Sequence, residues 1–303
     1  TQVRMDAPMI GAFQRELELK ESVVIKRLLP DYPAAAGKLF QIEEVSAPWA
    51  KNSSFTSVDG VGSFELDDGQ TTNLPYVDVL GEEFTQGTFR YRSGYYFDES
   101  EVSATAHRGA PIEEQKIFLV QQAYTETMNK LLLFGDRKTG LPGFINHPAW
   151  LRSYALYPLD GSSTQNQMLA TLNAGVQGVK KATNKVIKPD TLLIAERKYD
   201  FMTSQSRINE FQEKNTLRYF IENNPSVNNV QPMAELEGAG PNGEDVAIFY
   251  KRDPNYFKAR ITDPFRARPL FMVNPFSVYR AYAFSYNGLI VYIRYAAHVI
   301  IGI

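Results

Sequence analysis

A glycine-rich basic stretch in the middle of the chain has the composition of a phosphate-binding loop. Residues 135–143, GDRKTGLPG, place Arg137 and Lys138 ahead of Gly140. In a P-loop, the glycine at that position is followed by Lys and by Ser or Thr, which reach the phosphates and Mg²⁺. Leucine and proline follow it here, at positions 141–142. The stretch therefore lacks the side chains that would perform this chemistry.

The segment before this stretch also disfavours phosphate binding. A P-loop follows a strand and opens a helix whose N-terminus faces the phosphate. Residues 111–134 instead predict a helix that ends at the loop, and a helix C-terminus carries partial negative charge. We interpret residues 135–148 as a hinge between two structural domains. Arg137 and Lys138 would then serve the helix C-terminus or a neighbouring subunit.

No other residues have the spacing of a catalytic or metal site. The absence of cysteine excludes thiol nucleophiles and zinc–thiolate sites. The histidines, His107, His147 and His298, form no HxH or HExxH pattern, and we expect each to be structural or solvated. The acidic pairs are sequence neighbours, which point to opposite faces of a strand: Glu43-Glu44, Asp67-Asp68, Glu82-Glu83 and Glu113-Glu114. We predict no catalytic residue, cofactor or metal, with an enzyme site assembled only in three dimensions as the alternative.

Arginines alternate with aromatic residues in two stretches, at 89–92 (FRYR) and 292–295 (YIRY). Aromatic rings beside cations can stack on single-stranded nucleic acid. The net charge of −2 is low for that task, because such binding requires unneutralised cations. We favour a sheet with aromatic residues in the core and arginines on the outer face.

The composition is that of an ordinary globular protein. The 303 residues are 44% hydrophobic and 22% charged, which permits one large domain or two smaller ones. The sequence contains no run of about 18 apolar residues, the length expected of a membrane-spanning helix. Thr1 is compatible with proteolytic removal of a leader.

The first quarter of the chain changes character near residue 34. Residues 8–29 predict an amphipathic helix with Phe13 and Leu17 on its apolar stripe. Residues 34–75 are rich in glycine and small polar residues, and their apolar residues follow no helical period. So long a segment with little core of its own is typical of a functional loop or of one that packs outside its own domain.

The rest of the chain predicts alternating elements. Alternating aromatics indicate a strand within residues 83–106, and Pro111 opens the long helix that ends at residue 134. The later predictions are a helix at 165–182 capped by Asp160 and Ser162 or Ser163, a buried strand at 191–195, a helix at 203–222, strands from 246 onward, and a hairpin turn at Asn287-Gly288.

The order of these parts resembles the major capsid proteins of tailed bacteriophages, whose fold is shared with encapsulin shell proteins. Residues 110–134 resemble the spine helix of that family, and NKLLLFGDRKTGLPGFINHP (129–148) resembles the segment that follows it. Further resemblances are TNLPYVDV (72–79) before the strand, PDTLLIAERKYDFMTS (189–204), and ITDPFRARPLF (261–271) with the closing hairpin.

The resemblance implies an α+β, phage major-capsid/encapsulin-like fold. It divides the chain into an N-terminal arm (1–33), an extended loop (34–82), a peripheral domain with the spine helix and a long sheet (83–148), an α/β axial domain (149–245) and returning C-terminal strands (246–303). The arm and the loop would lie on neighbouring subunits. Candidate assembly-interface residues are Phe13, Leu17, Trp49, Lys51, Phe55, Phe64, Arg137 and Lys138. Lys51 and Asn52 match no cross-linking motif, so we do not carry over the Lys–Asn isopeptide chemistry of some members.

The resemblance also implies a structural function and no enzymatic one. The protein would self-assemble into pentamers and hexamers of an icosahedral shell that encloses double-stranded DNA without sequence-specific binding. Portal, scaffold and decoration or vertex proteins would be its partners, no membrane or cofactor would be involved, and assembly would take place in the host cytoplasm. An encapsulin-type compartment loaded with cargo enzyme is the alternative that keeps the fold.

Overall fold

Two five-stranded sheets organise the part of the chain that the structure describes. The computed structural model describes residues 32–61, 78–98, 112–204, 206–209, 212–274 and 277–303. All of them belong to one compact unit, Tyr32–Ile303. The helix expected at residues 8–29 lies outside the described residues.

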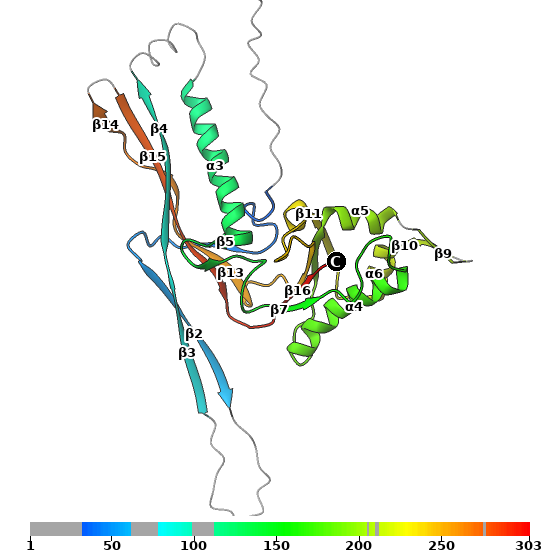
Figure 1. The fold of residues 1–303 in the computed structure, drawn as a ribbon. Coiled ribbons are helices and arrows are strands. Elements are labelled where there is room, and N and C mark those ends of the chain that lie inside the picture. Colours follow the sequence, from blue (N-terminus) through cyan, green and yellow to red (C-terminus); the bar gives the residue numbers. More distant parts are fainter. Residues whose placement is uncertain (1–31, 62–77, 99–111, 205, 210–211, 275–276) are drawn as a thin grey trace, which may run out of the picture. The chain divides into compact units, whose positions relative to one another are not determined.

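The first sheet, here called the long sheet, is built around a 15-residue strand. Its path is β1 (Ile42–Glu44), β13 (Phe257–Ala267), β15 (Ser277–Val291) and β14 (Phe271–Asn274), and β4 (Phe89–Asp98) pairs with the other edge of β15. The helix α3 (Ile112–Phe134) lies beside β4 and β15 (Figure 1). Its Tyr124 ring stacks on Phe265 with the centroids 4.3 Å apart. The long helix predicted from the sequence is confirmed, and it covers the aromatic face of this sheet.

The second sheet, here called the compact sheet, holds the centre of the hydrophobic core. Its order is β11 (Asn229–Met233), β8 (Thr191–Ala195), β12 (Val246–Tyr250), β16 (Ala297–Ile301) and β7 (Leu151–Tyr154). Every residue of β8, β12 and β16 is buried. Their runs of consecutive apolar residues suit strands that are covered on both faces.

Helix α4 (Gln165–Ala182) packs on the compact sheet and has the predicted bounds. Its N-cap was predicted wrongly. Thr164 caps the helix in a capping box with Gln167, whereas Asp160 accepts hydrogen bonds from Ser162 in the preceding turn. Thr164 is the N-cap because Gln167 occupies the third helical position, where its side chain can hydrogen-bond back to the backbone of the cap residue.

The helix predicted at residues 203–222 is also corrected. The chain there forms the end of α5 (Glu196–Ser204), a small hairpin of β9 (Ser206–Asn209) and β10 (Gln212–Asn215), and α6 (Thr216–Asn223). The Asn215 side chain accepts a hydrogen bond from the Arg218 backbone nitrogen at 2.8 Å. Asparagine favours an N-cap over a helix interior, so the helix begins after it.

Asn287 and Gly288 form a bulge inside β15, not the predicted hairpin turn. Arg260 pairs with Gly288, but its neighbour Ile261 pairs with Tyr286, so Asn287 is the extra residue. Gly288 has φ +101°, a conformation that side chains disfavour. Pairing with β13 continues on both sides of this point, and the strand does not turn back. Asparagine–glycine serves a bulge here because a bulge needs the same left-handed backbone as a tight turn.

The glycine-rich stretch forms a tight β-hairpin under the end of α3. β5 (Gly135–Asp136) pairs with β6 (Leu141–Pro142), and the turn between them carries Arg137 and Lys138 on its exposed side. The last carbonyls of α3 accept from the Phe144 and Ile145 nitrogens at 2.8 and 2.9 Å. The Asn146 side-chain amide donates to the last carbonyl, that of Phe134, at 2.8 Å. Two main-chain groups and this amide therefore cap the helix, in place of the two cations that the sequence suggested.

None of the helices within the described ranges is both long and apolar enough to span a bilayer.

Candidate assembly surface

The two-stranded hairpin that follows β1 is the first element of the candidate assembly surface. β2 (Asn52–Val61) and β3 (Asp78–Gly87) pair antiparallel from Asn52↔Gly87 to Val61↔Asp78. Among the described strands, neither pairs with a third one. A two-stranded ribbon is marginally stable by itself in water. Its stability must come from its base or from contacts outside the subunit.

An ionic cluster fastens the base of the hairpin to the long sheet. The Glu43 carboxylate receives Lys258 Nζ and Arg260 Nε, each at 2.8 Å. Arg260 Nη1 also donates to Ser53 Oγ at 2.7 Å, which ties the start of β2 to β13. Partial burial raises the pKa of Glu43, but the hydrogen bonds from Lys258 and Arg260 outweigh it and lower the pKa overall. Glu43 is therefore charged at neutral pH and holds both cations.

Asn287 fastens the other side of the base. This side chain is fully buried, and its amide nitrogen donates to Gln86 O at 3.0 Å, to Gly87 O at 3.2 Å and to Thr88 Oγ1 at 3.1 Å. These three acceptors form the corner where β3 passes into β4. The bulge in β15 thus serves to turn a side-chain amide toward that corner.

An aromatic groove of about 1030 Å³ lies beside the base. Phe55 on β2 stacks on Phe84 of β3 at 5.4 Å and meets Tyr292 edge-on at 5.5 Å. His147 lines the groove, and its ring nitrogen Nδ1 accepts from the Ala149 nitrogen at 3.2 Å. Burial lowers the pKa of His147 to about 4. The groove wall is therefore neutral at this residue above pH 5.

Trp49 projects from the turn just before β2 and is 79% exposed. The turn itself is held in place, because the Ala47 nitrogen donates to Thr262 O at 2.8 Å and the Ala50 nitrogen to Ala47 O at 3.0 Å. Arg90 Nη2 donates to the neighbouring Pro48 carbonyl at 3.2 Å. A large aromatic side chain on a fixed turn loses little entropy on binding, which is the property of an interface anchor.

The structure brings three of the predicted interface residues into one stretch. Trp49 and Lys51 are exposed, and Phe55 is half-buried in the groove wall, all within the approach to and the start of β2. Arg137 and Lys138 lie on a separate turn, between β5 and β6. The other three predicted residues, Phe13, Leu17 and Phe64, lie outside the described residues.

The sequence did not reveal the groups that hold this base. Glu43 was interpreted only as one of two neighbouring carboxylates that point to opposite faces of a strand, and Asn287 as a turn residue. Their partners, Arg260 and Gln86, are about 200 residues away in the chain. The aromatic spacing around Tyr292 was the one available signal, and it indicated a sheet core.

One histidine makes a contact that resembles part of a catalytic triad. His298 Nε2 lies 2.7 Å from Ser153 Oγ, and His298 Nδ1 lies 3.1 Å from Gly175 O. Because Nδ1 must donate to that carbonyl, Nε2 accepts from the serine. Among the described residues no carboxylate contacts the ring, and burial lowers the pKa of His298. The pair links β16 to β7 and α4, and lacks the orienting acid of a triad.

Comparison with known proteins identifies the family. The family model described as "Major capsid protein" matches residues 65–303. The chain belongs to the major capsid protein family. This family and its fold are structural, so the prediction of a non-enzymatic protein is confirmed. No curated protein matches the chain significantly.

Solved capsid structures share the fold of this family member. The capsid of Myoviridae phage XM1 is similar with a TM-score of 0.80 and 16% identity, over 95% of this chain and 98% of that chain. A structure from Mycobacterium phage Bobi gives 0.63 and 11%, over 99% of both chains. The virus-like particle from Pyrococcus furiosus gives 0.51 and 13%, over 87% and 90%. The predicted phage major-capsid/encapsulin-like fold is confirmed, and the chain is a capsid component of a phage-type, homo-oligomeric shell.

Proposed function

We propose that copies of this chain assemble into pentamers and hexamers that close an icosahedral shell around a double-stranded DNA genome. The observation that carries the proposal is the β2–β3 hairpin. Its base is bonded to the long sheet through Ser53 and through the corner at Gln86, whereas its ten-pair ladder has no third strand among those described. A ribbon of that kind gains stability when it lies on a neighbouring subunit.

Trp49, Lys51 and Phe55 are the residues that we propose for the contact with the neighbour. Trp49 supplies exposed apolar area on a fixed turn, and Lys51 is an exposed cation two residues away. Arg137 and Lys138 form a second candidate contact on the β5–β6 turn. The arm at residues 1–33 and the loop at 34–82 would lie on neighbouring copies in the same shell.

The net charge of −2 fits a shell that confines DNA without neutralising it. We therefore propose enclosure without sequence-specific binding, and assembly in the host cytoplasm. Portal, scaffold and decoration or vertex proteins are the proposed partners.

Electron microscopy and mass measurement of the purified protein test the proposal. We expect pentamers and hexamers, and closed shells under assembly conditions. A stable monomer that forms neither capsomers nor shells would overturn it.

An encapsulin-type compartment is the second candidate function, because the virus-like particle from Pyrococcus furiosus has a similar fold. Such a compartment would have the same fold and would enclose a cargo enzyme in place of DNA. The contents of native particles distinguish the two functions. Nuclease-protected DNA is expected for a virion, and a packaged enzyme with little DNA is expected for a compartment.

A further inference from the structure

The charges of the compact sheet and its helices are segregated along the chain. Residues 161–189 contain four lysines and no Asp or Glu. Residues 219–250 contain five carboxylates and no Lys or Arg. The chain as a whole is nearly neutral, so this contrast is a matter of distribution and not of composition.

The topology places the two segments at opposite ends of the same strands. The lysine-rich segment leads directly into the start of β8 at Thr191. β11 runs parallel to β8 and ends at Met233 opposite Ala195, from which the chain enters the 3₁₀ turn Ala234–Leu236. The acidic segment then leads into β12 at Val246, which pairs near that same end. Five residues of β8 separate the two ends by roughly 16 Å.

The basic rim consists of Lys180, Lys181, Lys185 and Lys188. Three of the four are exposed and Lys180 is half-buried. Lys180 and Lys181 lie in the last turn of α4, where they also suit the helix dipole. Lys185 and Lys188 lie beyond the helix and have no such role. Within the described ranges, none of the four forms an ion pair.

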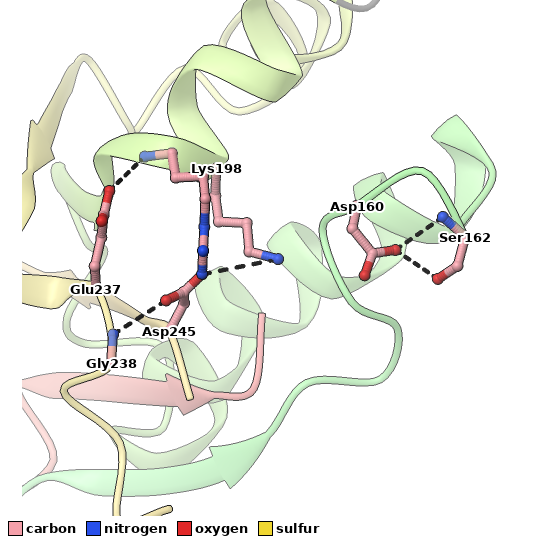
Figure 2. A network of polar contacts seen from close by, with 7 residues as sticks. Asp160, Ser162, Lys198, Glu237, Gly238 and Asp245 are labelled. Carbon is pink, nitrogen blue, oxygen red and sulfur yellow. Dashed lines mark hydrogen bonds and ion pairs between the residues drawn. The ribbon is translucent and has the colours of Figure 1, made fainter. Parts of the chain in front are cut away.

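The acidic rim consists of Glu196, Glu235, Glu237 and Glu244 at the other end of β8. Its two nearby cations are already engaged by a buried neighbour: Asp245, 5% exposed, receives Arg197 Nη2 at 2.7 Å and Lys198 Nζ at 3.9 Å. Figure 2 shows this network, in which the Gly238 nitrogen also donates to Asp245 at 3.1 Å.

Among the residues that the structure describes, none of the four rim carboxylates forms an ion pair of its own. Glu237 accepts the Arg197 backbone nitrogen at 2.9 Å, Glu244 accepts Asn242 and Glu235 accepts Asn129. Each of these donors is neutral, so in the described part of the chain the four rim carboxylates keep their net negative charge.

We propose that the basic rim of one copy docks on the acidic rim of the next copy around a ring. The two rims cannot neutralise one another within a subunit, because roughly 16 Å exceeds the Debye length of about 10 Å at 0.1 M salt. A two-fold contact centred on either rim would bring like charges together. A head-to-tail contact joins the two unlike rims, and it forms a closed ring when the rotation between neighbouring copies closes. The proposal rests on the capsomer-forming function proposed above.

Charge reversal at each rim tests the contact. One variant carries Lys181→Glu and Lys185→Glu, a second carries Glu196→Lys and Glu244→Lys, and a third carries all four changes. We expect each of the first two to weaken capsomer formation about 10-fold to 100-fold in dissociation constant. The third restores opposite charges at every contact and should recover most of the loss. Thermal unfolding of each variant checks that the subunit is folded.

A matched control reverses two cations outside both rims, Lys130→Glu with Arg218→Glu. Both residues are exposed, and among the described residues each forms an ion pair with a carboxylate one helical turn away and with no other. Equal loss of assembly in this control would assign the effect to net charge and overturn the inference. It is also overturned if the rim reversals assemble like the unchanged chain, or if the basic-rim variant loses only binding to duplex DNA. Failure of the unchanged chain to form capsomers would refute the proposed function instead.

Discussion

The side-chain amide of Asn287 donates to the carbonyl oxygen of Gln86 at 3.0 Å, joining two residues that are 201 positions apart. The contact anchors the corner at which the β2–β3 hairpin returns to the long sheet. Asn287 is the extra residue of a bulge in β15, and the bulge directs its side chain toward Gln86. The bulge in the long sheet therefore determines where the β2–β3 hairpin joins that sheet.

Replacing Asn287 with Ala should destabilise the subunit by about 1–3 kcal/mol, because the carbonyls of Gln86 and Gly87 would lose a buried donor. Urea unfolding measures the change. Asn287→Asp, which offers no donor at neutral pH, should cost at least as much. An unchanged midpoint in both variants would show that water replaces the amide.

Shortening the hairpin should separate folding from assembly. Ser57 and Glu82 are a backbone pair of the ladder, so residues 58–81 can be replaced by Asn-Gly in a two-residue turn. Ser53, Phe55 and the Gln86 corner all remain. We expect unfolding to stay cooperative at a similar midpoint while capsomers fail to build shells in electron microscopy. Normal shells from the shortened chain would remove the hairpin from the assembly contacts.

The two tryptophans of the chain should behave oppositely. Trp49→Ala should change the free energy of unfolding by less than about 0.5 kcal/mol, because Trp49 is 79% exposed. The same variant should weaken subunit association by about 2 kcal/mol or more if Trp49 is an anchor. Trp150 is 3% exposed, and Trp150→Ala should cost the fold about 3–5 kcal/mol. Light scattering measures the association energy. An unchanged association energy in the Trp49 variant would contradict the assignment of Trp49 as an interface anchor.

Acid should weaken the fold through His147. Burial lowers its pKa from 6.5 to about 4, so the unfolded chain binds its proton more readily than the folded one. This contribution is fully present above about pH 6.5 and is lost as the pH falls toward 4, to a total of about 3 kcal/mol. His147→Asn keeps an acceptor for the Ala149 nitrogen but does not titrate. Urea unfolding at pH 7.5 and 5 should show a smaller drop in the variant; equal drops would assign the pH dependence to other groups, such as His298.

Two glycines of the β5–β6 hairpin form a matched pair for substitution. A Cβ at Gly143 would lie 2.3 Å from the Gly135 nitrogen and 2.4 Å from the Leu133 carbonyl oxygen. A Cβ at Gly140 meets nothing within 4 Å, although its φ is +73°. Gly140→Ala should therefore cost about 1 kcal/mol, from the left-handed backbone alone. Gly143→Ala should cost several times more, measured by thermal unfolding, because two backbone groups would have to move. Similar costs would mean that the hairpin can shift away from α3.

Local sequence signals were sufficient to predict several helices and strands. The long helix α3, helix α4 and strand β8 have apolar periods or runs and end signals within about 25 residues, and each is found where it was predicted. The order of those elements also sufficed for the family resemblance. The absence of cysteine and of clustered histidines came directly from composition, and the family confirmed a structural protein.

The tertiary structure alone decided how ambiguous signals are used. Asn287-Gly288 can form a hairpin turn or a bulge, since both need the same backbone, and only the continued pairing with β13 selects the bulge. By sequence, Arg137 and Lys138 were suitable partners for the last carbonyls of α3. In the folded chain, two of those carbonyls accept hydrogen bonds from the Phe144 and Ile145 nitrogens instead. Glu43 became part of an anchor because Lys258 and Arg260 reach it from a strand more than 200 residues away. Contacts at that separation form only when distant segments such as β1 and β13 pair, and a local pattern in the sequence does not show which distant segments pair.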